Sequence, residues 1–314
     1  MGLHRLRQMT TRPLDVLCIG HASFDLVFSV PHHPAADEKI VADALLACGG
    51  GPAANAAVTV ARLGRKAGFA GYLGMDLYGE RHLEELRAAG IDTRAVVRGS
   101  SPTPLSVVLV KPDGRRALVN HKGDTRPLPP QAFVPPATPA RCILFDGHEP
   151  DLSEPALAWA RSHDAATVLD AGSLHGGSEW LMFRVGHLVA SEKFAAQWLG
   201  KNDPERALAA LAERSPCVVI TLGEHGLIWR RGAESGRLPA FPVEAVDTTG
   251  AGDVFHGAYA AGLAAGMDWP EMLRYASAAG ALCCTRLGAR PGIPSGAEVE
   301  RLLAGYGSKP QVMG

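Results

Sequence analysis

VDTTGAGDVFHG, at residues 246–257, is the stretch from which the fold and the chemistry of this chain can both be argued. A helical pattern begins at Asp253, and three small residues, Gly250, Ala251 and Gly252, precede it. These small residues let successive backbone N–H groups turn toward one point. Because a helix N-terminus offers unpaired N–H donors and the positive end of the helix dipole, an anion fits there.

Asp253 separates this stretch from an ordinary phosphate-binding loop. A carboxylate would repel a bound phosphate, but it makes chemical sense if it takes a proton from an attacking hydroxyl while the N–H groups hold the charge of a transferring phosphoryl group. We therefore interpret the stretch as the catalytic centre of a phosphotransferase. Asp253 is the predicted general base, and the amides of Gly250, Ala251 and Gly252 form the predicted anion hole. The alternative is an aspartate that only caps the helix after a glycine turn.

Short apolar runs alternate with helical patterns along most of the chain. The first run, Asp15–Gly20, ends in glycine, and Asp25 stands in the turn predicted after it. Later runs lie at 142–146, 167–170, 187–190 and 218–222, with helical patterns at 153–161, 193–199 and 204–214. This spacing predicts a mostly parallel sheet with right-handed crossovers. Residues 105–110 and 116–120 flank Asp113-Gly114 and predict a hairpin.

The stretch at 246–257 also resembles the C-terminal signature of the ribokinase (PfkB) family of sugar and nucleoside kinases. A second signature of that family, a glycine-rich run before a helix, is matched by GGGPAANAA at residues 49–57. The two signatures stand in the family's order, about 200 residues apart. The resemblance covers residues 15–303. Within the family it is greatest to 6-deoxy-6-sulfofructose kinases, on CTR at 284–286 and GIP at 292–294.

The resemblance implies an α/β fold of the ribokinase type. We expect three α/β/α layers, with a mostly parallel central sheet and a small β-sheet lid. One kinase domain is expected over residues 14–305, with the lid built from two separate segments at about 26–48 and 104–121. Residues 1–13 and 306–314 are predicted to be flexible.

Four residues are predicted to bind the sugar. Ligands of open α/β sheets bind beyond the carboxyl ends of the strands, and Asp25 follows the first strand. The resemblance implies that its carboxylate binds sugar hydroxyls. Gly50 and Gly51 allow close backbone approach to a ligand, and by resemblance they contact the sugar together with Asn55.

ATP and Mg²⁺ are the expected cofactors. The family keeps an Asn-x-x-Glu motif that is linked to magnesium. Residues 191–194 of this chain read SEKF, so the Asn and the final Glu are both absent and only Glu192 remains as a candidate ligand. Thr221, Gly223 and Gly226 resemble the family's nucleotide loop, although an ordinary strand–turn–strand accounts for them equally well. By resemblance, Cys284 lies in a segment that walls the adenine. Asp247 and Thr249 are the residues implied to hold a monovalent cation, which predicts stimulation by potassium.

The sulfofructose resemblance makes three further positions matter for the substrate. In those kinases a lysine, an asparagine and an arginine hold the sulfonate. Lys39 and Asn120 stand where the first two are expected, but His148 stands in place of the arginine. Histidine lacks the two-pronged guanidinium and is largely neutral near pH 7. The substrate is therefore predicted as a furanose-form sugar, either 6-deoxy-6-sulfofructose or a neutral sugar such as fructose or ribose.

Composition excludes several other classes. The formal net charge is −1, so nothing favours a nucleic-acid partner. No apolar run approaches the ~18 residues of a membrane span, and the first twelve residues lack the apolar centre of a secretory signal. The six cysteines form no C-x-x-C pair and are expected to be reduced. We expect a cytoplasmic protein whose partners are a sugar and ATP, with a homodimer through the lid suggested by the resemblance.

The sequence leaves two other functions to consider. A dinucleotide-dependent oxidoreductase is disfavoured, because the turn after the first strand reads GHASF and lacks G-x-G-x-x-G. A sugar-binding sensor without catalysis is disfavoured by the intact GAGD and favoured by the incomplete Asn-x-x-Glu motif.

Overall fold

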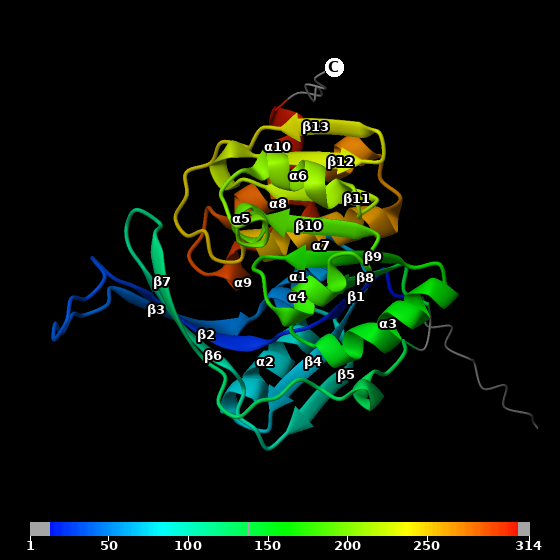
Figure 1. The fold of residues 1–314 in the computed structure, drawn as a ribbon. Coiled ribbons are helices and arrows are strands. Elements are labelled where there is room, and N and C mark those ends of the chain that lie inside the picture. Colours follow the sequence, from blue (N-terminus) through cyan, green and yellow to red (C-terminus); the bar gives the residue numbers. More distant parts are fainter. Residues whose placement is uncertain (1–12, 137–138, 307–314) are drawn as a thin grey trace, which may run out of the picture.

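The computed structural model describes residues 13–136 and 139–306, which form two β-sheets and the helices around them (Figure 1). The larger sheet has nine strands in the order β13-β12-β11-β10-β9-β8-β1-β4-β5. Their bounds are β1 Val16–Ile19, β4 Ala67–Gly74, β5 Asp92–Gly99, β8 Cys142–Phe145, β9 Ala166–Ala171, β10 His187–Ser191, β11 Cys217–Thr221, β12 Leu227–Arg231 and β13 Glu234–Leu238. Strands β11 to β5 in this order are parallel, and β12 and β13 add an antiparallel edge.

The parallel strands are apolar along their length because both faces of the sheet are covered. In β1 all four residues are buried. Side chains alternate across a strand, so Val16 and Cys18 join one apolar core and Leu17 and Ile19 join the other. The run of consecutive apolar residues is thus the expected sequence of a strand between two helical layers.

The helices form the two outer layers (Figure 1). One layer contains α1 Pro52–Arg62, α2 Leu77–Ala88, α7 Ala251–Ala265, α8 Trp269–Cys283 and α10 Gly296–Gly305. The other contains α3 Pro150–Ser162, α4 Gly176–Leu181, α5 Glu192–Leu199 and α6 Pro204–Ala212. The short α9, Ala289–Gly292, and two 3-10 turns, Pro130–Ala132 and Gly223–His225, lie in connections. The predicted fold class is confirmed.

The smaller sheet, which we call the lid, has the order β3-β2-β6-β7 and projects from one side of the body (Figure 1). Its strands are β2 Ser23–Ser29, β3 Ala44–Gly50, β6 Leu105–Val110 and β7 Arg116–His121. β2 begins four residues after β1 ends, so the lid leaves the main sheet at the carboxyl end of β1. The chain adds β4 and β5 on one side of β1 and β8 to β11 on the other, so the strand order reverses at β1. Open α/β sheets bind their ligands at such a reversal point.

Asp25 lies inside strand β2 and not in a turn after β1, because Phe24 and Val27 give this segment enough buried apolar surface to pair in the lid. The predicted flexible ends fall on residues 1–12 and 307–314, which lie outside the described residues, together with Pro13 and Tyr306, which are described. The single domain and the lid boundaries at 26–48 and 104–121 stay predictions.

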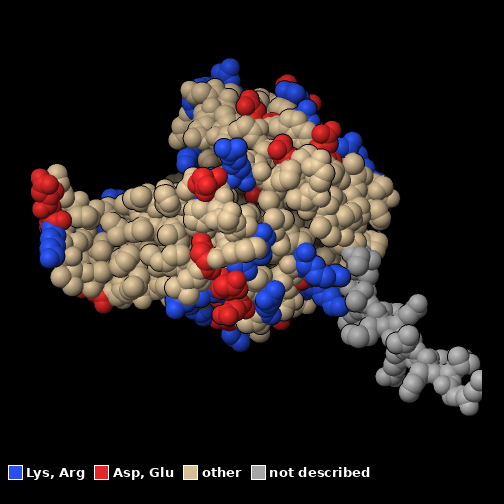
Figure 2. Space-filling view, turned by 90° about the horizontal axis from the view of Figure 1, so that it is seen from below, with Lys and Arg blue, Asp and Glu red and all other residues tan. Residues whose placement is uncertain are grey.

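Charges are interspersed on the face seen in Figure 2, with no extended patch of one sign. The projecting lid carries few charged side chains along its visible side, and they gather at its tip (Figure 2). Within residues 13–136 and 139–306, the helices are all too short or too polar to cross a bilayer.

Candidate active site

The N-terminus of α7 presents its backbone N–H groups at the carboxyl ends of the parallel strands. Gly250 is the N-cap, with φ of 77°, a left-handed conformation that glycine adopts without strain. A Cβ at this position would also lie 2.4 Å from Cβ of Ala289. Ala251 N–H makes a long 3.4 Å bond to the carbonyl of Thr248. Helix geometry leaves the N–H groups of Gly252 and Asp253 without an intrahelical acceptor.

Asp253 is the third residue of α7 and does not cap it, so the alternative of a capping aspartate is wrong. Asn55 on α1 donates a hydrogen bond from Nδ2 to Oδ2 of Asp253, at 2.8 Å. Burial and the nearby carboxylates of Asp170 and Asp25 raise the pKa of Asp253 to about 7, against the opposing effects of Asn55 and His256. A carboxyl group with this pKa can accept a proton near neutral pH.

The predicted sugar residues gather around the same edge. Asp25, Ser106 and Asn120 are register partners on β2, β6 and β7, and register partners point to the same face of a sheet. Ser23 donates to Oδ1 of Asp25 at 2.8 Å. Burial raises the pKa of Asp25, whereas the Ser23 and Ser106 hydroxyls lower it. A Cβ on Gly50 would lie 2.1 Å from Oδ2 of Asp25, so only glycine fits there.

Ser106 was missed by the sequence reasoning, because a serine in an apolar hairpin gives no signal until the register is known. Asn55 lies on the first turn of α1, as predicted, and is 2% exposed. Its Oδ1 accepts no hydrogen bond from the part of the chain that the structure describes. This buried acceptor is free for a ligand hydroxyl. Gly51 is the N-cap of α1, with φ of 93°.

Asp146, which follows β8, was also missed as a site residue. Its carboxylate accepts backbone N–H bonds from His21 at 2.7 Å, from His148 at 2.8 Å and from Ala53 at 3.2 Å. It therefore fixes the turns after β1 and β8 and the start of α1 relative to one another. Its signal in the sequence was the same as that of Asp25, a carboxylate at the end of an apolar run.

His148 belongs to a cluster of three imidazole rings at the ends of β1, β8 and β9. Its ring stacks on that of His175, with centroids 4.5 Å apart, and lies 5.3 Å from that of His21. Burial and the proximity of His148 lower the pKa of His21 to about 4 and also lower that of His175. Lys39 lies exposed in the loop between β2 and β3, and no contact that the structure describes joins it to this cluster.

The lid reaches the loop before α7. Arg116 on β7 donates to the hydroxyl of Thr248 at 3.2 Å. A Cβ on Gly114, in the β6–β7 turn, would lie 3.4 Å from the carbonyl oxygen of Val246. The hairpin therefore closes against the segment that leads to the anion hole, where a lid can exclude water.

Asp247 joins two loops behind the anion hole. Its Oδ1 accepts hydrogen bonds from N and Oγ1 of Thr249, at 2.9 and 2.6 Å, and its Oδ2 accepts one from Gly288 N–H at 2.8 Å. The Cys284 carbonyl accepts from the N–H groups of Val246 and Asp247. Asp247 is fully buried. These contacts hold the loop in place whether or not a cation binds.

The predicted nucleotide residues lie at the ends of β10 and β11. Glu192 is the first residue of α5 and is partly exposed, and Thr221 ends β11. β11 pairs with β12 in an antiparallel strand–turn–strand through Gly223 and Gly226. Gly226 is needed there for its φ of 86° and because a Cβ would lie 2.0 Å from the Leu238 carbonyl oxygen.

Within the described ranges, no group of three or more His, Cys, Asp or Glu residues could hold a metal ion by itself. Mg²⁺ is often held by one or two carboxylates together with substrate phosphates. Glu192, the partly exposed first residue of α5, offers one carboxylate of this kind.

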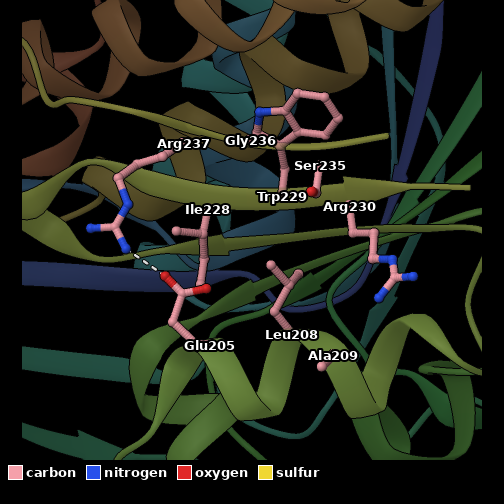
Figure 3. A pocket seen from close by; sticks show the side chains of 9 residues that line it. All are labelled: Glu205, Leu208, Ala209, Ile228, Trp229, Arg230, Ser235, Gly236 and Arg237. Carbon is pink, nitrogen blue, oxygen red and sulfur yellow. Dashed lines mark hydrogen bonds and ion pairs between the residues drawn. The ribbon is translucent and has the colours of Figure 1, made fainter. Parts of the chain in front are cut away.

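An open groove of about 360 Å³ lies elsewhere, between α6 and strands β12 and β13 (Figure 3). Arg237 and Glu205 form an ion pair across it, with Arg230 at the other end (Figure 3). None of its lining residues belongs to the site around Asp253. The groove is a surface depression at the antiparallel edge of the sheet.

Comparisons with known proteins agree with this geometry. The model of the pfkB family carbohydrate kinases matches residues 13–296. Ribokinase of Bacillus subtilis is 30% identical, over 92% of this chain and 99% of its own length. The ATP-dependent ribose-1-phosphate kinase of Halopiger xanaduensis is also 30% identical, over 88% of this chain and 93% of its own. The crystal structure of Thermotoga maritima ribokinase superposes with a TM-score of 0.79 at 28% identity, over 93% of this chain and 99% of that one.

The Asp253→Asn variant is expected to become more stable than wild type as the pH rises. The pKa of Asp253 is about 7 in the folded protein and near its ordinary 3.8 in the unfolded chain. The folded state therefore holds the extra proton between these values, and the free energy of unfolding falls as the pH rises through this window. Asparagine does not titrate, and Asn55 can donate to its carbonyl. In urea unfolding, the advantage of Asp253→Asn is expected to grow by about 1–3 kcal/mol between pH 5 and pH 8.

Asp76→Asn is the matched control with the opposite sign. Although burial raises the pKa of Asp76, hydrogen bonds from Thr103 and Gly79 hold it below the ordinary value. Its stabilisation is present above the unfolded pKa and is lost only in acid, so Asp76→Asn is expected to be less stable than wild type at both pH values. If the stability of Asp253→Asn relative to wild type does not increase between pH 5 and pH 8, the raised pKa of Asp253 is wrong.

Proposed function

The chain belongs to the pfkB family of carbohydrate kinases, and from this membership we propose that it transfers the γ-phosphate of ATP to a primary hydroxyl of a furanose-form sugar. Asp253 is the general base that removes the proton of the hydroxyl. The N–H groups of Gly250, Ala251 and Gly252 hold the charge of the transferring phosphoryl group. In-line transfer of this kind depends mainly on positioning and on electrostatic stabilisation.

The observation that carries the proposal is the placement of Asp253. Its carboxylate stands on the first turn of α7, next to N–H groups that have no intrahelical acceptor, and its pKa is about 7. Asn55 holds one oxygen at 2.8 Å, and Oδ1 of the same asparagine is free to accept a bond from a sugar hydroxyl. A base, an anion hole and a hydroxyl acceptor therefore meet at one point.

ATP and Mg²⁺ are expected for a kinase of this family. Magnesium, when bound, neutralises charge on the β- and γ-phosphates, and Glu192 is the carboxylate proposed to hold it. Thr221, Gly223 and Cys284 are proposed to line the nucleotide site. For Gly226 the close approach to Leu238 is the stronger account. A monovalent cation near Asp247 and Thr249, and stimulation by potassium, stay predictions.

We propose a neutral sugar, such as ribose or fructose, as the main substrate. Asp25, Ser106 and Asn120 offer a row of hydroxyl-binding groups on the inner face of the lid. Near His148, burial keeps His21 and His175 uncharged at neutral pH, because the pKa values of both are lowered. Uncharged imidazoles suit hydroxyl groups better than a sulfonate, which favours arginine.

An anionic sugar, with 6-deoxy-6-sulfofructose as one case, is the second candidate. It is favoured by Lys122, whose charge is close enough to lower the pKa values of His21 and His175. One relative is a kinase of ribose 1-phosphate, so an anionic sugar fits within this family. Lys39 is exposed on the lid loop and would have to move to reach the substrate.

We also propose that two chains pair through the outer faces of their lids. Leu26 and Phe28 on β2, Val107 and Leu109 on β6, and Val119 on β7 alternate with the inward-facing residues. Val119 is 66% exposed, and Leu45 on β3 is 59% exposed. An apolar face of this kind on a projecting sheet favours association.

Asp253→Asn is expected to lower kcat by a factor of ~10²–10⁴, the usual range for loss of a general base. The Kd values for sugar and ATP should stay within about threefold, because the asparagine has the same shape and can still accept from Asn55. Sugar-dependent ADP release measures turnover, and calorimetry measures binding. Equal losses in binding and turnover would contradict the role of Asp253 as a base. A wild-type protein that binds sugar but never releases ADP would be a sensor.

His148→Arg is expected to raise kcat/KM for anionic sugars relative to neutral ones, by about tenfold or more if a charge-assisted bond forms. The screen compares ribose and fructose with 6-deoxy-6-sulfofructose and ribose 1-phosphate. His163→Arg, at the opposite end of α3, is the matched control and should leave the ratio unchanged. An unchanged ratio in His148→Arg would remove His148 from the sugar site.

Val119→Lys is expected to convert a dimer into a monomer, because two lysines would be buried face to face without partners. Light scattering measures the mass. Leu77→Lys is the control, since Leu77 is exposed to a similar extent, 61%, and lies on α2, outside the four strands of the lid. A monomeric wild type, or a dimer that survives the Val119 substitution, would contradict pairing through the lids.

A further inference from the structure

His256 lies one turn after Gly252 on α7 and is 2% exposed. Its Nδ1 stands 2.6 Å from the Gly252 carbonyl oxygen, and its Nε2 stands 3.0 Å from the Val189 carbonyl oxygen on β10. Oδ2 of Asp170, at the end of β9, lies 3.3 Å from Nδ1. The ring thus joins the first turn of α7 to two neighbouring strands of the sheet.

The two carbonyl groups decide where the protons are. A carbonyl oxygen only accepts, so each ring nitrogen satisfies its neighbour only when it carries a proton. An unprotonated Nδ1 at 2.6 Å from an oxygen would oppose two lone pairs. The geometry therefore favours the imidazolium, with the buried carboxylate of Asp170 as its counter-ion.

Asp170 has the surroundings of such a counter-ion. It is 5% exposed, and its Oδ2 accepts no hydrogen bond from the residues that the structure describes. Burial and the charge of Asp146 raise the pKa of Asp170 to about 8, so the pair keeps its extra proton at neutral pH. Burial lowers the pKa of His256, and the hydrogen bonds to the carbonyl groups of Val189 and Gly252 oppose that shift. A neutral pair, with the proton on Asp170, and an ion pair, with the proton on His256, hold the same number of protons. The contacts of the ring with the two carbonyl groups place this proton on His256.

We propose that His256, paired with Asp170, is a positioning residue of the phosphotransfer site. Its ring holds the Gly252 carbonyl group and, through it, the first turn of α7. The inference rests on the proposed function of Asp253. The Gly252 carbonyl belongs to the peptide group whose nitrogen is the N–H of Asp253. When the ring fixes this peptide plane, it fixes the direction of that N–H and the base of the Asp253 side chain.

Two amide substitutions separate the two contacts of the ring. The amide nitrogen of asparagine overlaps Nδ1 of histidine, and that of glutamine overlaps Nε2. His256→Asn can therefore still donate to Gly252, whereas His256→Gln can donate only toward Val189. We expect His256→Asn to keep kcat within about fivefold of wild type. His256→Gln and His256→Phe are expected to lose ~10–100-fold in kcat, with KM values within about threefold, as for loss of transition-state positioning.

His187→Phe is the matched control. His187, the first residue of β10, is partly buried, and its Nδ1 lies 2.8 Å from the hydroxyl of Tyr259 on α7. The His187→Phe substitution should lower the melting temperature as much as His256→Phe does, and it should leave kcat unchanged. A parallel loss of kcat in the Asn and Gln variants, or in the His187 control, would overturn the proposal.

A second measurement does not depend on turnover. In ¹⁵N NMR spectra of wild type at pH 7, both ring nitrogens of His256 should show the shifts of protonated imidazole, assigned by their loss in His256→Phe. In Asp170→Asn the ring should lose one proton at a lower pH than in wild type. A singly protonated ring in wild type would overturn the ion pair even if the enzyme is active. Absence of turnover in wild type with an intact imidazolium signal would instead contradict the proposed kinase function.

Discussion

The close packing of α1 against α7 is the constraint on which the site depends. A Cβ on Gly257 would lie 2.7 Å from the Ala56 carbonyl oxygen, so the two helices approach to a distance that only small residues allow. At that distance Asn55 reaches Asp253. A larger residue at either contact would separate the base from the asparagine that orients it and would open the fully buried core between the helices.

The acidic residues at this edge of the sheet fall into two groups with different physical roles. Asp146 and Asp247 accept three hydrogen bonds each, mostly from backbone N–H groups, and they join loops. Asp253 and Asp170 have fewer donors, and burial raises the pKa values of both. Carboxyl groups with strongly shifted pKa values are concentrated at functional sites. The second group is therefore where proton transfer and its electrostatic control are expected.

The lid contributes in a different way, because its register decides which residues face the substrate. The pairing of β2 with β6 and of β6 with β7 places Asp25, Ser106 and Asn120 in one row. Two of these residues could be proposed from sequence by resemblance. Ser106 could not, since a slip of one residue in the hairpin would turn it to the opposite face. The contact between Arg116 and Thr248 likewise joins segments 132 residues apart.

The parallel sheet, the two signatures and the catalytic stretch could be predicted from the sequence, because each rests on a local signal: short apolar runs, and small residues before a helix that begins near an aspartate. It did not place Asp25 in a strand, and it gave no role to Asp146, Asp170 or His256. Those roles depend on which side chains and carbonyl groups meet across separate elements. They could be recognised only in the folded chain, since hydrogen bonding and desolvation act between neighbours in space and leave no periodic trace along the sequence.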